Sequence, residues 1–194
     1  MRLILASASP RRRELLAACT IPFQIIPAAI DEHPFPGEAA EVHVRRLALA
    51  KAETVSQRHP DAVVLGADTI VTIAGLLLGK PQSIDAARRM LYRLSGREHE
   101  VLTGMAVVPG RLAGIPAAGA AIEVVASRVL MRHLTAATIE WYIATGEPLD
   151  KAGAYAVQGL GGALVERVEG SYTNVVGLPL TETLALLRRF GIAG

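Results

Sequence analysis

The order of apolar and polar positions along the 194 residues predicts short buried strands that alternate with amphipathic helices. Strands are predicted where apolar residues run together between turn-forming residues, over residues 3–6, 23–26, 62–65, 70–73, 101–108, 121–130 and 163–168. Helices are predicted where apolar residues return every three or four positions, from Ser9 onward and over residues 38–57, 83–94, 135–144 and 180–189. Because strands and helices alternate first and paired strands follow, the pattern predicts a mixed α/β sheet.

Three stretches break this pattern and are predicted to lie outside regular elements. Residues 31–37 contain two prolines and predict a loop, and the Pro-, Gly- and Ala-rich residues 109–119 predict an exposed connection. The glycine-rich residues 146–162 predict irregular structure close to a functional site. None of these is a linker long enough to divide the chain, so we expect a single domain over residues 1–194, which could have two lobes around a cleft.

Composition narrows the class of protein. With 51% hydrophobic and 20% charged residues, the chain has the make-up of a globular protein with a sizeable core. The net charge of +2 is too small to indicate a protein that coats nucleic acid. The single cysteine excludes an intrachain disulfide and a zinc site of several cysteines. Because no apolar run has the length of a signal peptide core or a membrane span, we expect a soluble, cytoplasmic protein.

The segment Ser7-Ala8-Ser9-Pro10-Arg11-Arg12 is a candidate anion site. Ser9 can cap a helix and Pro10 suits its first turn. A strand that runs into a helix start presents free backbone N–H groups and the positive end of the helix dipole, where anions bind. Ser7 and Ser9 add hydroxyl donors, and Arg11 and Arg12 can hold phosphate oxygens in bidentate fashion. The alternative is a capped helix with solvated arginines, although cations at a helix N-terminus oppose the dipole.

Two carboxylates and two lysines are the other candidates for chemistry. Asp68 is predicted to follow a buried strand directly, where ligands bind in open α/β sheets, and Glu32 lies in the predicted loop. Together they could hold a divalent cation, most plausibly magnesium, with phosphate oxygens completing the shell. Lys51 and Lys80 could neutralise a triphosphate. On pattern alone, Asp68 could equally be a turn residue, and each lysine is more often a solvated surface charge.

Missing motifs exclude other reactions. The chain has no Gly-rich loop ending in Lys-Ser/Thr, and Gly159-Leu160-Gly161-Gly162 lacks the dinucleotide-binding spacing. No Gly-x-Ser-x-Gly elbow is present, and the five histidines show no paired ligand spacing. Kinase-type chemistry and hydride transfer are therefore unsupported.

Five ordered segments resemble the Maf family of nucleoside triphosphate pyrophosphatases over nearly the full length of the chain. They are Leu5-Ala6-Ser7-Ala8-Ser9-Pro10-Arg11-Arg12 with Glu14-Leu15-Leu16, Leu65-Gly66-Ala67-Asp68-Thr69, Gly79-Lys80-Pro81, Leu149-Asp150-Lys151-Ala152-Gly153-Ala154-Tyr155, and Glu169-Gly170-Ser171-Tyr172 leading to residues 174–180. The resemblance implies an inosine-triphosphatase-like α/β fold, with a mixed twisted sheet, flanking helices and a deep cleft between two lobes.

The resemblance also implies a reaction and a role for each residue. Water would attack the α-phosphorus of a nucleoside triphosphate, with help from a divalent cation, Mg²⁺ or Mn²⁺, and release the monophosphate and pyrophosphate. Asp68 would be the general base and a metal ligand, and Glu32 a further metal ligand. The phosphates would be held by Ser7, Ser9, Arg12, Lys51 and Lys80. A general base of this kind contributes about 10²–10⁴ in rate.

Three positions indicate the branch of the family. The branch acting on dTTP and UTP resembles this chain in having Arg11, Thr69 and Gln158, whereas the branch that prefers N-methylated guanosine triphosphate has Trp, Gln and Glu there. One primary amide can satisfy both the ring N–H and the carbonyl of thymine or uracil. The expected substrates are therefore dTTP and UTP, with modified pyrimidine nucleotides included.

Other readings remain open from the sequence. The resemblance links the family with septum formation and division arrest, so a non-enzymatic nucleotide-responsive regulator is the alternative function. Such a module could dispense with the carboxylates, and the joint presence of Glu32, Asp68, Lys51 and Lys80 favours an enzyme. Nucleic-acid binding is least supported, because aromatic residues make up only 4% of the chain. We expect no membrane partner, and the resemblance implies a homodimer.

Overall fold

A computed structural model describes residues 2–114 and 119–192. The strands are β1 (Arg2–Leu5), β2 (Phe23–Ile25), β3 (Ala62–Ile73), β4 (Leu76–Leu78), β5 (Glu98–Pro109), β6 (Ala121–Met131) and β7 (Val165–Glu169). The α-helices are α1 (Pro10–Ala17), α2 (Ala40–Ser56), α3 (Ile84–Leu94), α4 (Ala136–Ala144), α5 (Tyr172–Val176) and α6 (Leu180–Arg189). Short 3₁₀ helices are η1 (Glu147–Asp150), η2 (Ala152–Ala154) and η3 (Gly159–Leu164).

The strands form a mixed sheet, as the sequence pattern predicts. Within the described residues it has seven strands in the order β2-β1-β3-β5-β6-β7, and β4 pairs with β3. Strand β1 runs parallel to both β2 and β3, whereas the β3–β4 and β6–β7 pairs are antiparallel.

The chain folds into two compact units, each made of separate stretches of sequence. The first contains the residues up to Asp68, Thr103–Val125 and the residues from Gly177 on, and the second contains Thr69–Leu102 and Ala126–Val176. The chain thus enters and leaves each unit more than once, and no single linker separates them. That residues 1–194 act as one domain stays a prediction.

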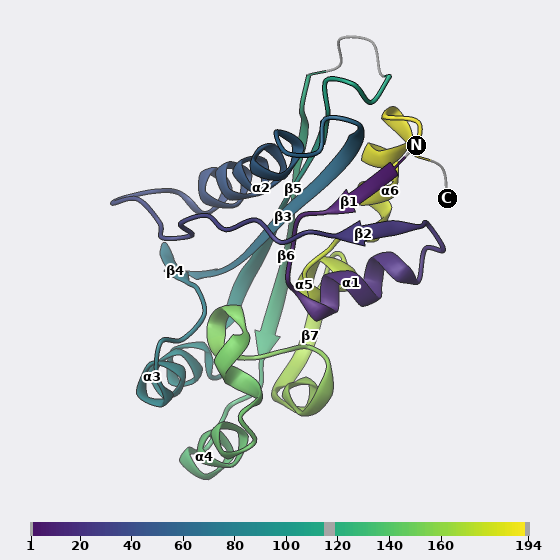
Figure 1. Ribbon diagram of the computed structural model, residues 1–194. Helices are drawn as coiled ribbons and strands as arrows, with labels where there is room; N and C mark the ends of the chain where they lie inside the picture. Colours follow the sequence, from purple (N-terminus) through teal and green to yellow (C-terminus); the bar gives the residue numbers. More distant parts are fainter. Residues whose placement is uncertain (1, 115–118, 193–194) are drawn as a thin grey trace. The chain divides into compact units, whose positions relative to one another are not determined.

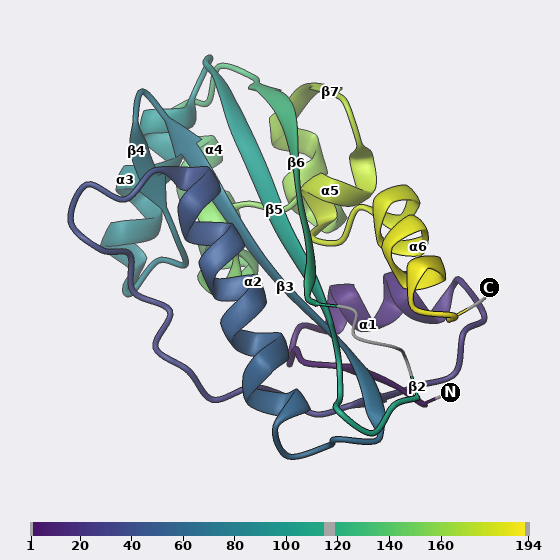
Figure 2. The same cartoon turned by 90° about the horizontal axis from the view of Figure 1, so that it is seen from above.

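The first unit is layered, with helices on both faces of its part of the sheet. Leu3 and Leu5 of β1 pack in a cluster with residues of α1 and α6, whereas Ile4 between them packs in a cluster with residues of α2. This alternation follows from the two-residue period of a strand. Figure 2 shows α2 along one face and α1 and α6 along the other. Both faces of β1 are therefore covered, which explains its continuous apolar run.

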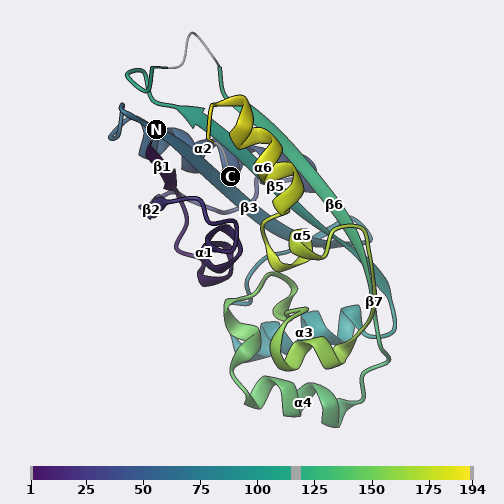
Figure 3. The same cartoon turned by 90° about the vertical axis from the view of Figure 1, so that its right-hand side faces the viewer.

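The second unit has its own core. Leu91 and Leu94 of α3 pack with Ile139 and Tyr142 of α4, and Tyr155, which follows η2, joins the same cluster. Figures 1 and 3 show α3 and α4 close together in the teal and green part of the chain. No described helix is long and apolar enough to cross a membrane.

The structure corrects the predicted course of the chain around Asp68. Two strands were expected, over residues 62–65 and 70–73, with Gly66–Thr69 as the end of the first. Instead β3 is one continuous strand of 12 residues that includes Asp68. Apolar periodicity did not reveal this, because Gly66, Asp68 and Thr69 resemble turn residues in sequence. The short elements β4 and α5 were also not predicted, and part of the predicted 109–119 connection lies outside the described residues.

Candidate active site

The predicted anion site forms a capped helix start, as its sequence indicates. Ser9 is the N-cap of α1 in extended conformation, and its Oγ accepts a hydrogen bond from the backbone N–H of Arg12. Pro10 stands at the first helical position. The Oγ of Ser7 accepts a hydrogen bond from the backbone N–H of Ser9 at 3.2 Å. The two serine hydroxyls thus hold the turn in place. The positive end of the α1 dipole lies at this turn.

Arg12 is buried, in contrast to a solvated arginine. Its Nε donates to the carbonyl of Gly177 at 2.8 Å, and its Nη1 donates to the carbonyl of Ala67 at 2.9 Å and to Ser7 Oγ at 3.3 Å. Burial lowers the pKa of Arg12, and the nearby charges of Asp68 and Glu32 oppose that shift. The guanidinium therefore ties the start of α1 to the strand position just before Asp68. Its predicted role as a phosphate clamp stays a prediction.

Lys51 and Asp68 form a buried ion pair. Lys51 is 6% exposed and Asp68 is 7% exposed. The Nζ of Lys51 lies 2.7 Å from Oδ1 of Asp68 and 2.6 Å from Oε1 of Glu32. One ammonium thus holds two carboxylates together. The interpretation of Lys51 as a solvated surface charge is wrong, because its side chain is buried. A buried ammonium needs the carboxylate partners seen here.

Gly66 explains how Lys51 reaches Asp68. A Cβ at Gly66 would lie 2.2 Å from the carbonyl oxygen of Ala48 and 2.8 Å from the backbone N of Ala52. Only glycine permits helix α2 to approach β3 this closely. Lys51 lies between Ala48 and Ala52 on the helix, so the close approach brings its ammonium to the strand that carries Asp68.

The loop that carries Glu32 is fastened to the same helix. Arg46 of α2 donates to both carboxylate oxygens of Glu38 at 2.7 Å and to the carbonyl of His33 at 3.2 Å. Its guanidinium also lies 4.0 Å above the centre of the Phe35 ring. The hydrogen bonds from Arg46 lower the pKa of Glu38 to about 2, although burial alone would raise it. Helix α2 thus supplies Lys51 and anchors the loop beside Glu32.

Comparison with known sequences identifies the family of this chain. The sequence model described as "Maf-like protein" matches residues 2–190. The chain belongs to the Maf family. It is 56% identical over 192 residues to a dTTP/UTP pyrophosphatase of Myxococcus xanthus, covering 98% of this chain and 93% of that one. It is 52% identical over 191 residues to a dTTP/UTP pyrophosphatase of Moorella thermoacetica, covering 98% and 96%.

Solved structures show that the fold is shared more widely. The Ham1 protein of Staphylococcus aureus superposes with a TM-score of 0.55 at 12% identity, covering 98% of this chain and 97% of the other. A HAM1 protein of Coxiella burnetii gives a TM-score of 0.55 at 14% identity, covering 97% and 99%. The predicted Maf membership and the mixed α/β fold are confirmed.

The donor set of this Maf protein fits a divalent cation. Glu32 and Asp68 direct carboxylate oxygens at one positive charge, the Lys51 ammonium. Oxygen ligands suit magnesium, which is commonly held by one or two carboxylates together with substrate phosphates. In the described part of the chain, no group of three or more His, Cys, Asp or Glu could hold a metal. Phosphate oxygens and water would therefore have to complete the shell.

The remaining predicted site residues of this Maf chain are distributed over both units. Arg11 follows Pro10 in the first turn of α1, in the first unit. Thr69, Lys80 and Gln158 belong to the second unit. Lys80 is exposed after β4, and its backbone carbonyl accepts a hydrogen bond from Gln82 Nε2 at 3.2 Å. Their part in one site with Asp68 stays a prediction.

Gln158 lies next to a turn whose backbone N–H groups bind the carboxylate of Glu147. Glu147 Oε1 accepts hydrogen bonds from the Tyr142 hydroxyl and the Gly161 backbone N–H, both at 2.9 Å, and Oε2 accepts from Leu160 N–H at 3.1 Å. Burial would raise the pKa of Glu147, but these donors outweigh it and lower it. Gln158 immediately precedes this anchored turn and is exposed, and its side chain makes no hydrogen bond within the described residues.

Sequence reasoning missed three residues that fix the backbone near predicted site residues. Gly66 acts through the backbone of helix α2, and Glu147 through the backbone of η3, whereas Glu38 binds Arg46 only eight positions away. Only Gly66 carried a usable signal, because a glycine inside an apolar strand indicates close approach of another backbone.

Proposed function

We propose that this Maf protein hydrolyses dTTP and UTP to the nucleoside monophosphate and pyrophosphate. Relatives at 52–56% identity carry the name dTTP/UTP pyrophosphatase. The observation that carries the chemistry is the convergence of Asp68 and Glu32 on the Lys51 ammonium beside buried Arg12.

We assign the general base to Asp68. Its Oδ1 is engaged by Lys51, whereas Oδ2 has no hydrogen bond within the described residues and can accept a proton from water. The water oxygen then bonds to the α-phosphorus, its proton passes to Asp68, and the bond from the α-phosphorus to the bridging oxygen breaks. Pyrophosphate leaves with that bridging oxygen. The hydrogen bond from Lys51 orients the carboxylate.

The phosphate groups would lie against the positive end of α1. Ser7 Oγ and Ser9 Oγ accept hydrogen bonds from backbone N–H groups at that helix start, and each hydroxyl keeps a proton that it could donate to a phosphate oxygen. Lys51 and Lys80 would counter the charge that develops on the leaving pyrophosphate. A divalent cation, Mg²⁺ or Mn²⁺, held by Glu32 and Asp68, would polarise phosphate oxygens and neutralise their charge.

The base would be recognised through Gln158, together with Arg11 and Thr69. The exposed Gln158 amide can donate to a carbonyl and accept from the ring N–H of thymine or uracil. The same edge occurs in many modified pyrimidines, so we include them among the substrates. A cytoplasmic location is part of the proposal, because nucleoside triphosphates are pooled there.

A nucleotide panel assayed for pyrophosphate release, with Mg²⁺, Mn²⁺ and Co²⁺ in turn, tests the proposal. We expect dTTP and UTP to release pyrophosphate in a metal-dependent reaction. Asp68→Asn should lower turnover by about 10²–10⁴-fold while the protein stays folded. The exposed Asp61→Asn is the matched control and should have full activity.

Three results would contradict the proposal. Release of orthophosphate alone would exclude cleavage between the α- and β-phosphates. Full activity of the Asp68→Asn protein would remove Asp68 from catalysis. Tight nucleotide binding without any turnover by the wild-type protein would favour the regulatory alternative.

A further inference from the structure

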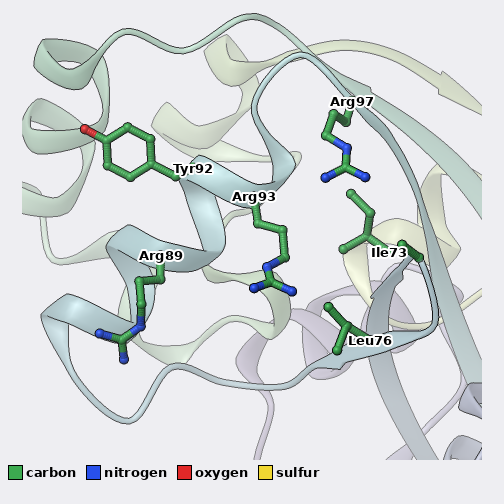
Figure 4. A pocket seen from close by; sticks show the side chains of 7 residues that line it. Ile73, Leu76, Arg89, Tyr92, Arg93 and Arg97 are labelled. Atoms are coloured by element: carbon green, nitrogen blue, oxygen red, sulfur yellow. The ribbon is translucent and has the colours of Figure 1, made fainter.

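A surface pocket of about 480 Å³ lies beside helix α3 in the second unit. Ile73 and Leu76 line it from the β3–β4 hairpin, and Arg89, Arg93 and Arg97 line it from α3 and the turn that follows. Figure 4 shows Arg93 reaching toward the hairpin and Arg97 directed toward Ile73, with Arg89 about one helical turn before Arg93. None of these residues belongs to the candidate active site.

The three guanidinium groups have no acidic partner among residues 2–114 and 119–192. Within the described residues, Arg89, Arg93 and Arg97 are all exposed and make no hydrogen bond or ion pair through their side chains. Arg88, the immediate neighbour of Arg89, differs sharply. It pairs with Asp85 and donates to both carboxylate oxygens of Glu140, at 2.5 and 2.9 Å. The nearby acids thus neutralise Arg88 and leave the pocket positive.

Helix stability does not account for this charge. Arg89 and Arg93 are four residues apart on α3, where like charges repel. Arg93 lies in the last turn and is favoured by the helix dipole, but Arg89 lies in the middle of the helix. A concave surface lined by charges of one sign concentrates its field and raises the local concentration of anions.

We propose that this pocket is a second binding site, for a small anion that carries at least two phosphate groups. Each guanidinium matches the geometry of phosphate oxygens. Three of them suit an anion of high charge, and Ile73 and Leu76 provide an apolar wall. The volume is typical of small-molecule sites and small for a macromolecule. The ligand is either free pyrophosphate or a nucleotide, which share this chemistry.

Equilibrium dialysis at low salt tests the proposal with two probes, inorganic pyrophosphate and the α,β-methylene analogue of UTP. We compare the wild-type protein with the triple variant Arg89→Ala, Arg93→Ala, Arg97→Ala. The matched control replaces the exposed Arg58, Arg111 and Arg188 by Ala, which changes net charge equally. The pocket variant should bind one equivalent fewer of at least one probe, and the control variant should bind as the wild type does.

The two probes distinguish the sources of the phosphate. Loss of a pyrophosphate equivalent identifies the free anion, and loss of the analogue alone identifies a nucleotide. Unchanged stoichiometry and affinity for both probes would overturn the proposal. Weakened binding of a single-stranded oligonucleotide, with both small probes unaffected, would also overturn it.

A second variant guards against a folding defect in the triple variant. Arg93→Glu reverses one charge at an exposed position and should weaken probe binding at least about 10-fold, more at low than at high salt. Because these experiments measure binding and not catalysis, their outcome does not depend on whether the protein has the proposed pyrophosphatase activity.

Discussion

The Nζ of Lys51 lies 2.7 Å from Oδ1 of Asp68, and both side chains are buried. Lys51 comes from helix α2 and Asp68 from the middle of strand β3. The contact therefore depends on how closely that helix lies on that strand, which Gly66 permits. The geometry of this ion pair therefore depends directly on the packing of α2 against β3.

Replacement of Lys51 by Met should leave two carboxylates without their shared cation. We expect a loss of about 3–5 kcal/mol in the free energy of unfolding, because an unpaired buried charge is costly, and loss of activity. Urea unfolding measures the first effect and pyrophosphate release the second. The double variant Lys51→Met, Asp68→Asn should be less destabilised than the sum of the single variants. Additive effects would show that the pair contributes no coupling.

Gly66→Ala should push helix α2 away from β3. The new Cβ would lie 2.2 Å from the Ala48 carbonyl oxygen, so backbone has to move. We expect destabilisation of at least about 1–3 kcal/mol and lower kcat, because Lys51 moves with the helix. Gly119→Ala is the control, since a Cβ there meets nothing within 4 Å. Equal stability of the two variants would show that Gly66 does not set the helix position.

Glu38→Gln should remove a pH-dependent contribution to stability. Hydrogen bonds from Arg46 lower the pKa of Glu38 from 4.5 to about 2, so the ionised form stabilises the fold. This stabilisation is complete above about pH 4.5 and declines as pH falls toward 2. The wild-type protein should be more stable than the variant at pH 7, with the difference shrinking in that window. A constant difference between the wild-type protein and the Glu38→Gln variant across that window would contradict the assignment.

Glu147→Gln should loosen the turn that follows Gln158. An amide nitrogen in place of one carboxylate oxygen would face backbone N–H groups that now donate to it. We expect the free energy of unfolding to fall by about 1–3 kcal/mol. The KM for dTTP should rise, with a smaller change in kcat. Tyr142→Phe, which removes one of the donors to Glu147, should have a smaller effect of the same kind. An unchanged KM in both variants would separate this turn from substrate binding.

Gln158→Glu should alter the choice of base. A carboxylate cannot donate to the carbonyl of thymine or uracil but accepts well from the donor-rich edge of guanine. We expect kcat/KM for dTTP to fall by an amount that corresponds to about 1–3 kcal/mol of lost transition-state stabilisation. The value of kcat/KM for GTP should fall less or rise. Gln158→Ala should weaken binding without this change of preference. Competition assays with dTTP and GTP measure the ratio, and an unaltered ratio would exclude Gln158 from base recognition.

Local sequence determined most of the secondary structure. Ser9 and Pro10 start α1 as predicted, because capping and a fixed proline φ act within one turn. Helix α6 covers residues 180–189 as predicted, since its apolar face follows the helical period. Family membership could also be predicted, because it rests on ordered short motifs that need no three-dimensional information.

Tertiary structure decided the state of the charged residues. On pattern alone, Lys51 is more often a surface lysine and Asp68 is equally a turn residue or a site residue, yet both are buried and paired across 17 positions of sequence. Arg12 is likewise buried, with its Nε bonded to Gly177, 165 residues away. Side-chain patterns report which face of an element is apolar, but not which backbone approaches it. The ion pair of Lys51 and Asp68 exists because the close approach at Gly66 removes water from both groups and leaves each as the other's partner.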